Sequence, residues 1–281
     1  MRYSMLEAVS EKARRTLFFG LKQITRTRSV SCIADIPYGN LPEQRVDLYM
    51  PVNAQPRYTV IFIHGGSWQY GNKDEYAFMG QSLARRGIAT LVMDYRLYPV
   101  ADYPAFVEDA ARMLAWHATS SAFYGLENRP LYLMGHSAGA HIAMLAVMDP
   151  DFASQYGFSV PNVKGIISLA GVYSFRPEKS PVYQKIFPAE QCGENYRKVK
   201  PVNFVRESGV PLYILHGRKD TTVACRSAER MYKNALLAGH PVFLKVREND
   251  GHYALLFDFV AYSPGHEATL GAIETFMQDY S

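Results

Sequence analysis

The chain has 281 residues, of which 48% are hydrophobic and 20% charged, and its formal net charge is +4. This is an ordinary globular composition, and no block of consecutive Lys or Arg residues indicates a nucleic-acid surface. Cys32, Cys192 and Cys225 lie far apart and form no C-x-x-C pair. That spacing argues against a disulfide framework or a zinc site, and it predicts a reducing, cytoplasmic location.

The first predicted element is a basic helix within residues 1–28. Its apolar core is short and no small-residue cleavage site follows, so it does not fit a secretory signal. No apolar run in the sequence is long enough to cross a bilayer. We favour a helix that packs over the body of the protein. The alternative is an amphipathic helix on a membrane surface, which would make this a lipid-associated protein with peripheral membrane contact.

Short apolar, β-branched segments predict eight strands. The first two, 29–36 and 45–49, flank the turn signal 37–42 and are expected to form an antiparallel pair at the edge of the sheet. The other strands are predicted at 58–63, 88–93, 131–134, 164–170, 211–216 and 241–246. Helical patterns alternate with them near 75–86, 103–119, 138–148, 224–238 and 268–279. This alternation predicts an α/β fold with a mostly parallel sheet that is covered by helices on both faces.

Residues 172–208 interrupt this alternation. Prolines recur in the segment among aromatic and charged residues, and its helical signals are short. A connection this long between two strands is typical of an active-site lid, and it would overhang the carboxyl ends of the strands, where such sheets bind ligands. We therefore predict a single domain of residues 1–281 with cap elements near residues 1–28 and 172–208.

A G-x-S-x-G pentapeptide, residues 135–139, stands between a predicted buried strand and a predicted helix. This strand–turn–helix context is that of a nucleophile elbow, in which Ser137 projects above the sheet. Gly135 and Gly139 are expected because a β-carbon at either position would collide with the neighbouring strand or helix. The alternative is that Ser137 only caps the helix.

A nucleophilic serine needs an imidazole base and a carboxylate that orients it, in the chain order serine, acid, histidine. His252 follows the last predicted strand, and Asp220 follows the strand before it. Glu248 and Asp250 are rivals to Asp220, but they share the loop of the histidine and are poorly placed to reach its far nitrogen. The alternatives are a surface histidine or metal ligand for His252 and a turn residue for Asp220. We expect the remaining histidines of these motifs to be structural: His136, His141 and His216.

The oxyanion hole is predicted to use the amide of Ala138 and amides of Gly65 and Gly66, which follow the strand at 58–63. Successive glycines leave backbone N–H groups unobstructed by side chains. Trp68 is a candidate wall of the substrate pocket, with ordinary core packing as the alternative.

Taken together, these motifs resemble the α/β-hydrolase carboxylesterases related to hormone-sensitive lipase. The resemblance rests on residues 64–68, 135–139, 216–220 and 251–252 and on Asp94-Tyr-Arg-Leu-Tyr-Pro99. Within that group the chain is similar to kynurenine formamidases, isoprenylcysteine methylesterases and the feruloyl/acetyl-xylan esterase branch. It departs from many members at Ser67, where a third glycine is usual, and at Tyr98, where alanine is common; these departures bear on the substrate.

The resemblance implies an α/β-hydrolase fold with a triad and an oxyanion hole: Ser137, Asp220 and His252; Gly65, Gly66 and Ala138. It predicts a serine hydrolase that cleaves a small-molecule carboxylic ester through an acyl-enzyme intermediate, with no metal or organic cofactor. Two alternatives remain: an arylformamidase that acts on N-formylkynurenine, and a non-catalytic binding protein with the hydrolase fold.

Overall fold

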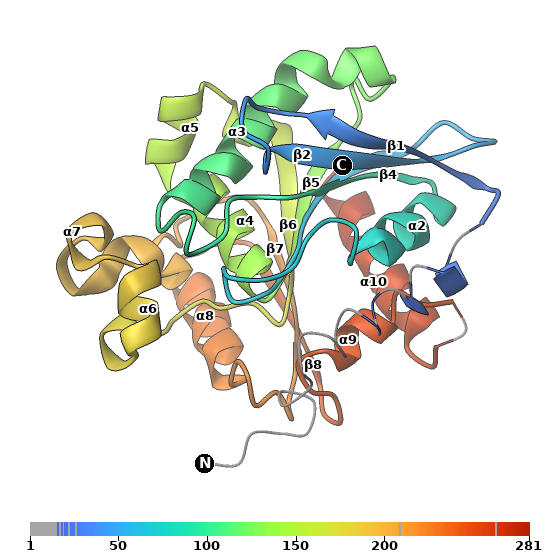
Figure 1. The fold of residues 1–281 in the computed structure, drawn as a ribbon. Helices are drawn as coiled ribbons and strands as arrows, with labels where there is room; N and C mark the ends of the chain where they lie inside the picture. The colour runs from blue at the N-terminus through green and yellow to red at the C-terminus, as the bar shows by residue number, and fades with distance from the viewer. Residues whose placement is uncertain are drawn as a thin grey trace.

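The computed structural model describes residues 16–281 except 17, 19, 22, 26, 208 and 262. Within these residues, strands form one eight-stranded sheet in the order β1-β2-β4-β3-β5-β6-β7-β8 (Figure 1). The strands are β1 (Val30–Pro37), β2 (Arg45–Pro51), β3 (Tyr58–Ile63), β4 (Ile88–Met93), β5 (Leu131–His136), β6 (Val163–Leu169), β7 (Leu212–Gly217) and β8 (Val242–Arg247). Strands β3 to β8 are parallel, whereas β1 and β2 form the predicted antiparallel edge.

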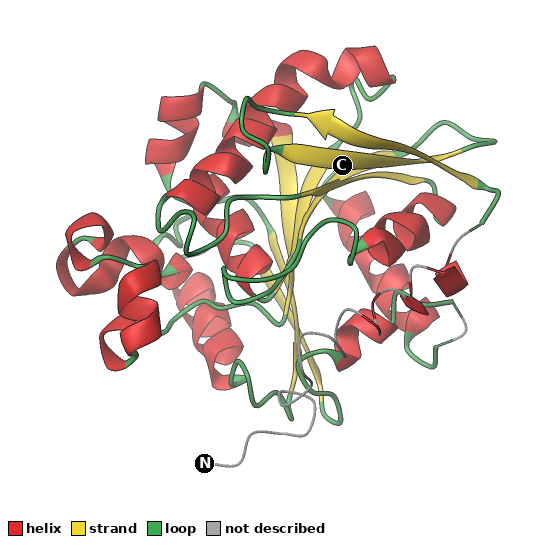
Figure 2. Cartoon of the chain, viewed as in Figure 1, coloured by secondary structure: helices red, strands yellow, loops and turns green. Residues whose placement is uncertain are grey.

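Helices cover both faces of this sheet, as the sequence predicts (Figure 2). Every residue of β3, β4 and β5 is buried, because a covered parallel sheet leaves neither side of its central strands exposed. One layer contains α3 (Ala105–Ser120), α4 (Ala138–Met148), α5 (Pro150–Tyr156) and α8 (Arg226–Leu237). The other contains α2 (Ala77–Arg85), α9 (Ala254–Phe257) and α10 (His266–Asp279).

The short helices α5 and α9 were not among the predicted elements. Helix α5 nevertheless has a local start signal, since the side chain of Asp149 accepts the N–H of Asp151 at 3.1 Å and Pro150 occupies the first turn. Helix α9 has only four residues and no side-chain cap, so its formation depends on packing rather than on local sequence.

Residues 172–208, called the cap segment below, contain only short helices. These are α6 (Pro181–Ile186), α7 (Ala189–Cys192) and 3-10 turns at 177–179, 194–199 and 201–203. Helix α7 is followed by Gly193, whose positive φ of 71° favours glycine at this position. Phe187 of the segment is buried, and its ring lies 4.9 Å from that of Trp68, so the segment packs over the loop that follows β3.

The predicted N-terminal helix lies mostly outside the described residues. Its described portion, between residues 16 and 25, is helical. Phe18 is buried there, with its ring 5.1 Å from that of Tyr76 and 5.9 Å from that of Phe78. This portion therefore packs on the body of the protein. The described part of the chain holds no helix with both the length and the apolar character needed to cross a membrane.

Candidate active site

The pentapeptide at residues 135–139 forms the sharp turn that its sequence predicts. Strand β5 ends at His136 and α4 begins at Ala138, and Ser137 between them has a φ of 53°. A β-carbon on Gly135 would overlap the backbone of Gly139, and one on Gly139 would overlap the carbonyl of Ile63. The predicted reason for both glycines is confirmed. A positive φ at a serine costs of the order of 1–3 kcal/mol, which the surrounding packing must offset.

Three predicted side chains meet at the carboxyl ends of β5, β7 and β8. The Nε2 atom of His252 lies 2.9 Å from the Oγ of Ser137, and its Nδ1 lies 2.8 Å from Oδ2 of Asp220. Each of these residues is only 6% exposed, so water weakens the contacts little. Because the carboxylate accepts the Nδ1 hydrogen, Nε2 presents its lone pair to the serine hydroxyl.

The carboxylate of Asp220 is held from several sides. Its Oδ1 accepts the N–H groups of Thr222 at 2.9 Å and Val223 at 2.8 Å. Burial alone would raise the pKa of Asp220, but hydrogen bonds from His216 and His252 outweigh it and hold that pKa below its usual range. Asp220 therefore stays ionised at neutral pH, and its negative charge faces the imidazole.

His216 was expected to be structural, and the structure gives it a place beside this carboxylate. Its Nε2 lies 2.8 Å from the carbonyl oxygen of Val223 and 3.2 Å from Oδ2 of Asp220. The Nε2 hydrogen thus points between two acceptors and helps to fix the Asp220 loop. The only sequence signal for this contact is the four-residue spacing between the two side chains.

The rival acids are engaged elsewhere. Glu248 pairs with Arg218 at 3.3 Å, and Asp250 pairs with Arg247 at 3.1 Å. Both pairs lie in the loops around β7 and β8, and neither carboxylate bonds to the imidazole of His252 within the described structure. Of these three carboxylates, that of Asp220 lies against the imidazole.

Two histidines, His136 in the elbow and His141 in α4, are buried and neutral. Burial lowers the pKa of His136 to about 3 and that of His141 to about 4. The ring of His136 lies 4.8 Å from that of His252, so its neutrality avoids a second positive charge beside the proposed base. His141 accepts the Nε1 hydrogen of Trp68 at 3.3 Å and donates from Nε2 to the carbonyl of Val199 at 2.9 Å. The expectation that it is packed rather than reactive is consistent with these contacts.

The loop His64–Trp68, called the oxyanion loop below, folds back over the elbow. Gly66, with a φ of 132°, accepts the N–H groups of Gln69 and Tyr70 at 3.0 and 2.9 Å. A β-carbon on Gly65 would lie 3.2 Å from Cβ of Ser137, which shows how closely the loop approaches the serine. The N–H groups of Gly66 and Ala138 make no hydrogen bond within the part of the chain that the structure describes.

An ion-pair cluster around the buried Lys73 fixes the segment that follows this loop. The Nζ of Lys73 lies 2.8 Å from Asp35 and 3.0 Å from Asp47, and its N–H donates to Asp94 at 2.5 Å. Burial would lower the pKa of Lys73, but these carboxylates raise it above its ordinary value. The cluster thus joins the loop to the β1–β2 edge. The resemblance draws on Asp94, but the sequence gives no sign that Asp94 meets Lys73 in this way.

Trp68 is 2% exposed and lies among the rings of Phe106, His141, Phe175 and Phe187. It also borders a cavity of about 750 Å³. Trp68 therefore packs in the core and also borders this cavity, and its role in substrate binding stays a prediction.

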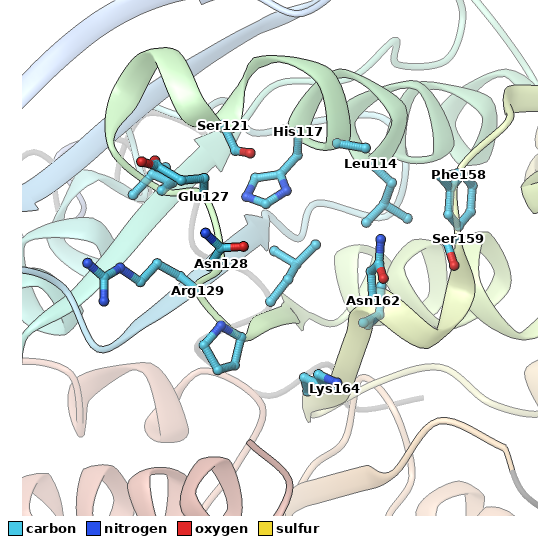
Figure 3. Close-up of a pocket in the computed structure, with 15 residues that line it drawn as sticks. Leu114, His117, Ser121, Glu127, Asn128, Arg129, Phe158, Ser159, Asn162 and Lys164 are labelled. Carbon is cyan, nitrogen blue, oxygen red and sulfur yellow. The ribbon is translucent and has the colours of Figure 1, made fainter.

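A second cavity, of about 440 Å³, lies at the other end of the strands (Figure 3). It is lined by Leu131, the first residue of β5, whereas Ser137 follows the last residue of that strand. His117 and Arg129 also line it, and burial lowers the pKa of His117 to about 4. Its position separates it from the reacting groups. Within the described residues, no cluster of three His, Cys, Asp or Glu side chains is arranged to hold a metal ion.

The fold and the elbow define the class of protein, which is a serine hydrolase with the α/β-hydrolase fold. A family model described as BD-FAE matches residues 46–235. The chain belongs to this family and is a hydrolase of carboxylic esters.

Curated relatives and solved structures agree with this assignment. A kynurenine formamidase of Danio rerio is 29% identical over 243 residues, covering 84% of this chain and 80% of that protein. An isoprenylcysteine alpha-carbonyl methylesterase of Arabidopsis thaliana is 28% identical over 240 residues, covering 79% of this chain. The chain spans only 54% of that plant protein. The structure of esterase B from Lactobacillus rhamnosis shares the fold, with a TM-score of 0.78, 21% identity, and coverage of 97% of this chain and 94% of that one.

Proposed function

We propose that this protein hydrolyses a small-molecule carboxylic ester through an acyl-enzyme intermediate on Ser137. The observation that carries the proposal is the position of the His252 ring, 2.9 Å from the serine oxygen and 2.8 Å from the carboxylate of Asp220. An imidazole held in this way takes the hydroxyl proton as the oxygen attacks, and the carboxylate stabilises the resulting imidazolium.

In this mechanism the carbonyl oxygen of the substrate becomes negatively charged beside the amides of Gly65, Gly66 and Ala138. His252 then returns its proton to the departing alcohol, and the acyl group remains on Ser137. A water molecule, activated by the same imidazole, releases the acid and restores the hydroxyl. The mechanism requires no metal or organic cofactor.

A formamidase is the second candidate, because the Danio rerio relative carries that name and covers most of this chain. The same nucleophile and base would attack the formyl carbonyl of an arylformamide. Trp68, Phe175 and Tyr183 line one cavity and would accept an aryl group.

Two measurements test these candidates. A fluorophosphonate probe should label Ser137 in the folded protein; failure to label it would favour the non-catalytic binding protein. Comparing kcat/KM for p-nitrophenyl acetate with that for N-formylkynurenine then separates the two enzymes. We expect the ester to be the better substrate, and faster turnover of the formamide would replace the esterase proposal.

The proposed oxyanion loop is tested by the substitution Gly65→Ala. The added methyl would lie 2.9 Å from the carbonyl oxygen of His136 and 3.2 Å from Cβ of Ser137, so the loop must move. We expect kcat for p-nitrophenyl acetate to fall about 10²- to 10³-fold, as for loss of one oxyanion donor.

Gly271→Ala on α10 is the matched control, because no atom lies within 4 Å of its added β-carbon. It should leave kcat unchanged. If Gly65→Ala retains the activity of the unchanged protein, the loop does not bind the oxyanion.

The remaining proposals concern organisation and location. We propose that the chain is one catalytic domain whose cap segment, together with the helix near residues 1–28, borders the entrance to the site. Phe187 and Ile186 of the cap segment are buried, which supports a fixed position for this part. We also propose a cytoplasmic location, because Cys32, Cys192 and Cys225 are free thiols in this structure.

A further inference from the structure

The cavity beside Trp68 combines an aromatic wall with a cationic rim. The rings of Trp68 and Phe175 stack 5.7 Å apart, and Tyr183 meets both rings edge-on at 5.9 Å. Its volume of about 750 Å³ is in the range of small-molecule sites. Its basic side chains come from two elements, the cap segment and α8: Arg176, Lys179, Arg226 and Arg230. We call this space the cationic cavity.

No acidic side chain lines the cationic cavity, and none of its basic residues forms an ion pair within the described structure. Glu229, next to Arg230 in sequence, is paired with Arg218 instead. Glu178 and Glu194 border a neighbouring hollow, whose lining also includes Arg176 and Arg230. Lys179 and Arg226 line the cationic cavity and do not line that hollow. Neither of these two residues forms an ion pair within the described structure.

Helix α8 adds to this positive potential. Its amino end forms part of the wall, and a helix of 12 residues carries partial positive charge there. The Oγ of Ser227, in the same wall, is buried and has no hydrogen-bond partner among the residues described.

The loops that carry the reacting groups also form the walls of the cationic cavity. Trp68 is the last residue of the oxyanion loop, and Val223 donates its N–H to Asp220 at 2.8 Å. Val172 follows β6, whose last residue accepts the N–H of Ser137 at 2.9 Å. The cavity thus borders the elements that position the serine and its acid, while the three reacting side chains themselves lie outside its lining.

We propose that the substrate is an anionic ester, with an apolar portion against the rings and a carboxylate or phosphate group at the cationic rim. This inference rests on the proposed ester hydrolysis by Ser137. Arg and Lys side chains form short, charge-assisted hydrogen bonds with such groups, and a cleft of one sign of charge concentrates oppositely charged substrates. A neutral ester of equal size gains only the aromatic contacts.

The test compares esters that differ in one charged group. Monoethyl glutarate is matched with ethyl pentanoate, and 2-acetoxyethyl phosphate with butyl acetate, by following acid release at constant pH. We expect kcat/KM at low salt to be roughly tenfold higher for the anionic member of at least one pair, the effect of two partly exposed ion pairs. The pair that shows the preference identifies the acid group. The preference should decline as salt rises.

The double variant Lys179→Gln/Arg226→Gln should reduce the ratio of the two kcat/KM values to near one, mainly through KM. The control Lys233→Gln/Lys245→Gln removes two exposed charges that do not line the cavity, and it should leave the ratio unchanged. An equal ratio in the wild-type protein and the cavity variant would overturn the proposal, as would a preference for the neutral esters. If Ser137 also fails to react with a fluorophosphonate and no ester is cleaved, the ester hydrolysis proposal itself fails.

Discussion

Replacing Ser137 with alanine is expected to lower kcat/KM for p-nitrophenyl acetate roughly 10⁵- to 10⁶-fold, by comparison with other serine hydrolases. The substitution removes the oxygen that lies 2.9 Å from His252 and leaves no other nucleophile at this point of the elbow. The backbone turn remains, because it depends on Gly135 and Gly139 rather than on the hydroxyl.

The variant should fold normally. Loss of one hydrogen bond changes stability by about 1 kcal/mol, which thermal unfolding will detect. Ser121→Ala provides a matched control, because this serine borders the cavity at the opposite end of the strands. It should keep full activity and fluorophosphonate labelling. Activity near that of the wild-type protein in Ser137→Ala would refute the nucleophile.

The substitution Asp220→Asn is expected to lower kcat about 10⁴-fold while the fold is retained, as in other triads. Oδ1 accepts the N–H groups of Thr222 and Val223 at 2.9 and 2.8 Å, so an amide must keep its oxygen at that position. Its NH₂ group then faces Nδ1 of His252. Nδ1 must then accept a hydrogen bond, so the ring hydrogen moves to Nε2. With that hydrogen in place, Nε2 can no longer take the proton of Ser137.

Asp250→Asn is the control for this prediction. Asp250 belongs to the same group of strand-end loops, but its carboxylate pairs with Arg247 at 3.1 Å instead of with the imidazole. Its replacement should change kcat by no more than a few-fold. Each variant removes one negative charge at this edge of the sheet, but only Asp220→Asn removes the carboxylate that orients the imidazole. A difference in kcat between them therefore reports the orienting role and not the loss of charge. Near-normal turnover by Asp220→Asn would remove Asp220 from the triad.

The predictable parts of this fold are those in which the local sequence is compatible with only one kind of secondary structure. Continuous apolar runs such as Tyr58–Ile63 fit a strand covered on both faces. The boundaries were less exact, since α10 begins at His266 and not at 268 as predicted. The helices α5 and α9 were missed because they are short and owe their stability largely to packing.

The candidate site likewise has parts that local sequence predicts and parts that it does not. The elbow could be read from the sequence because Gly135 and Gly139 are required by contacts within one strand–turn–helix unit and its adjoining strand. Asp220 and His252 followed from chain order, since the carboxyl ends of parallel strands meet at one edge. Local pattern did not reveal that His216 also faces the carboxylate of Asp220.

By itself, therefore, the sequence determined the strand and helix pattern, the elbow, and the three side chains expected to meet. Only the tertiary structure decided the strand order, the burial of Lys73 between Asp35 and Asp47, and the convergence of cap and α8 cations on one cavity. The physical reason is that these contacts join residues that are distant in the chain. Their partners depend on how the layers pack, and no short stretch of sequence specifies that packing.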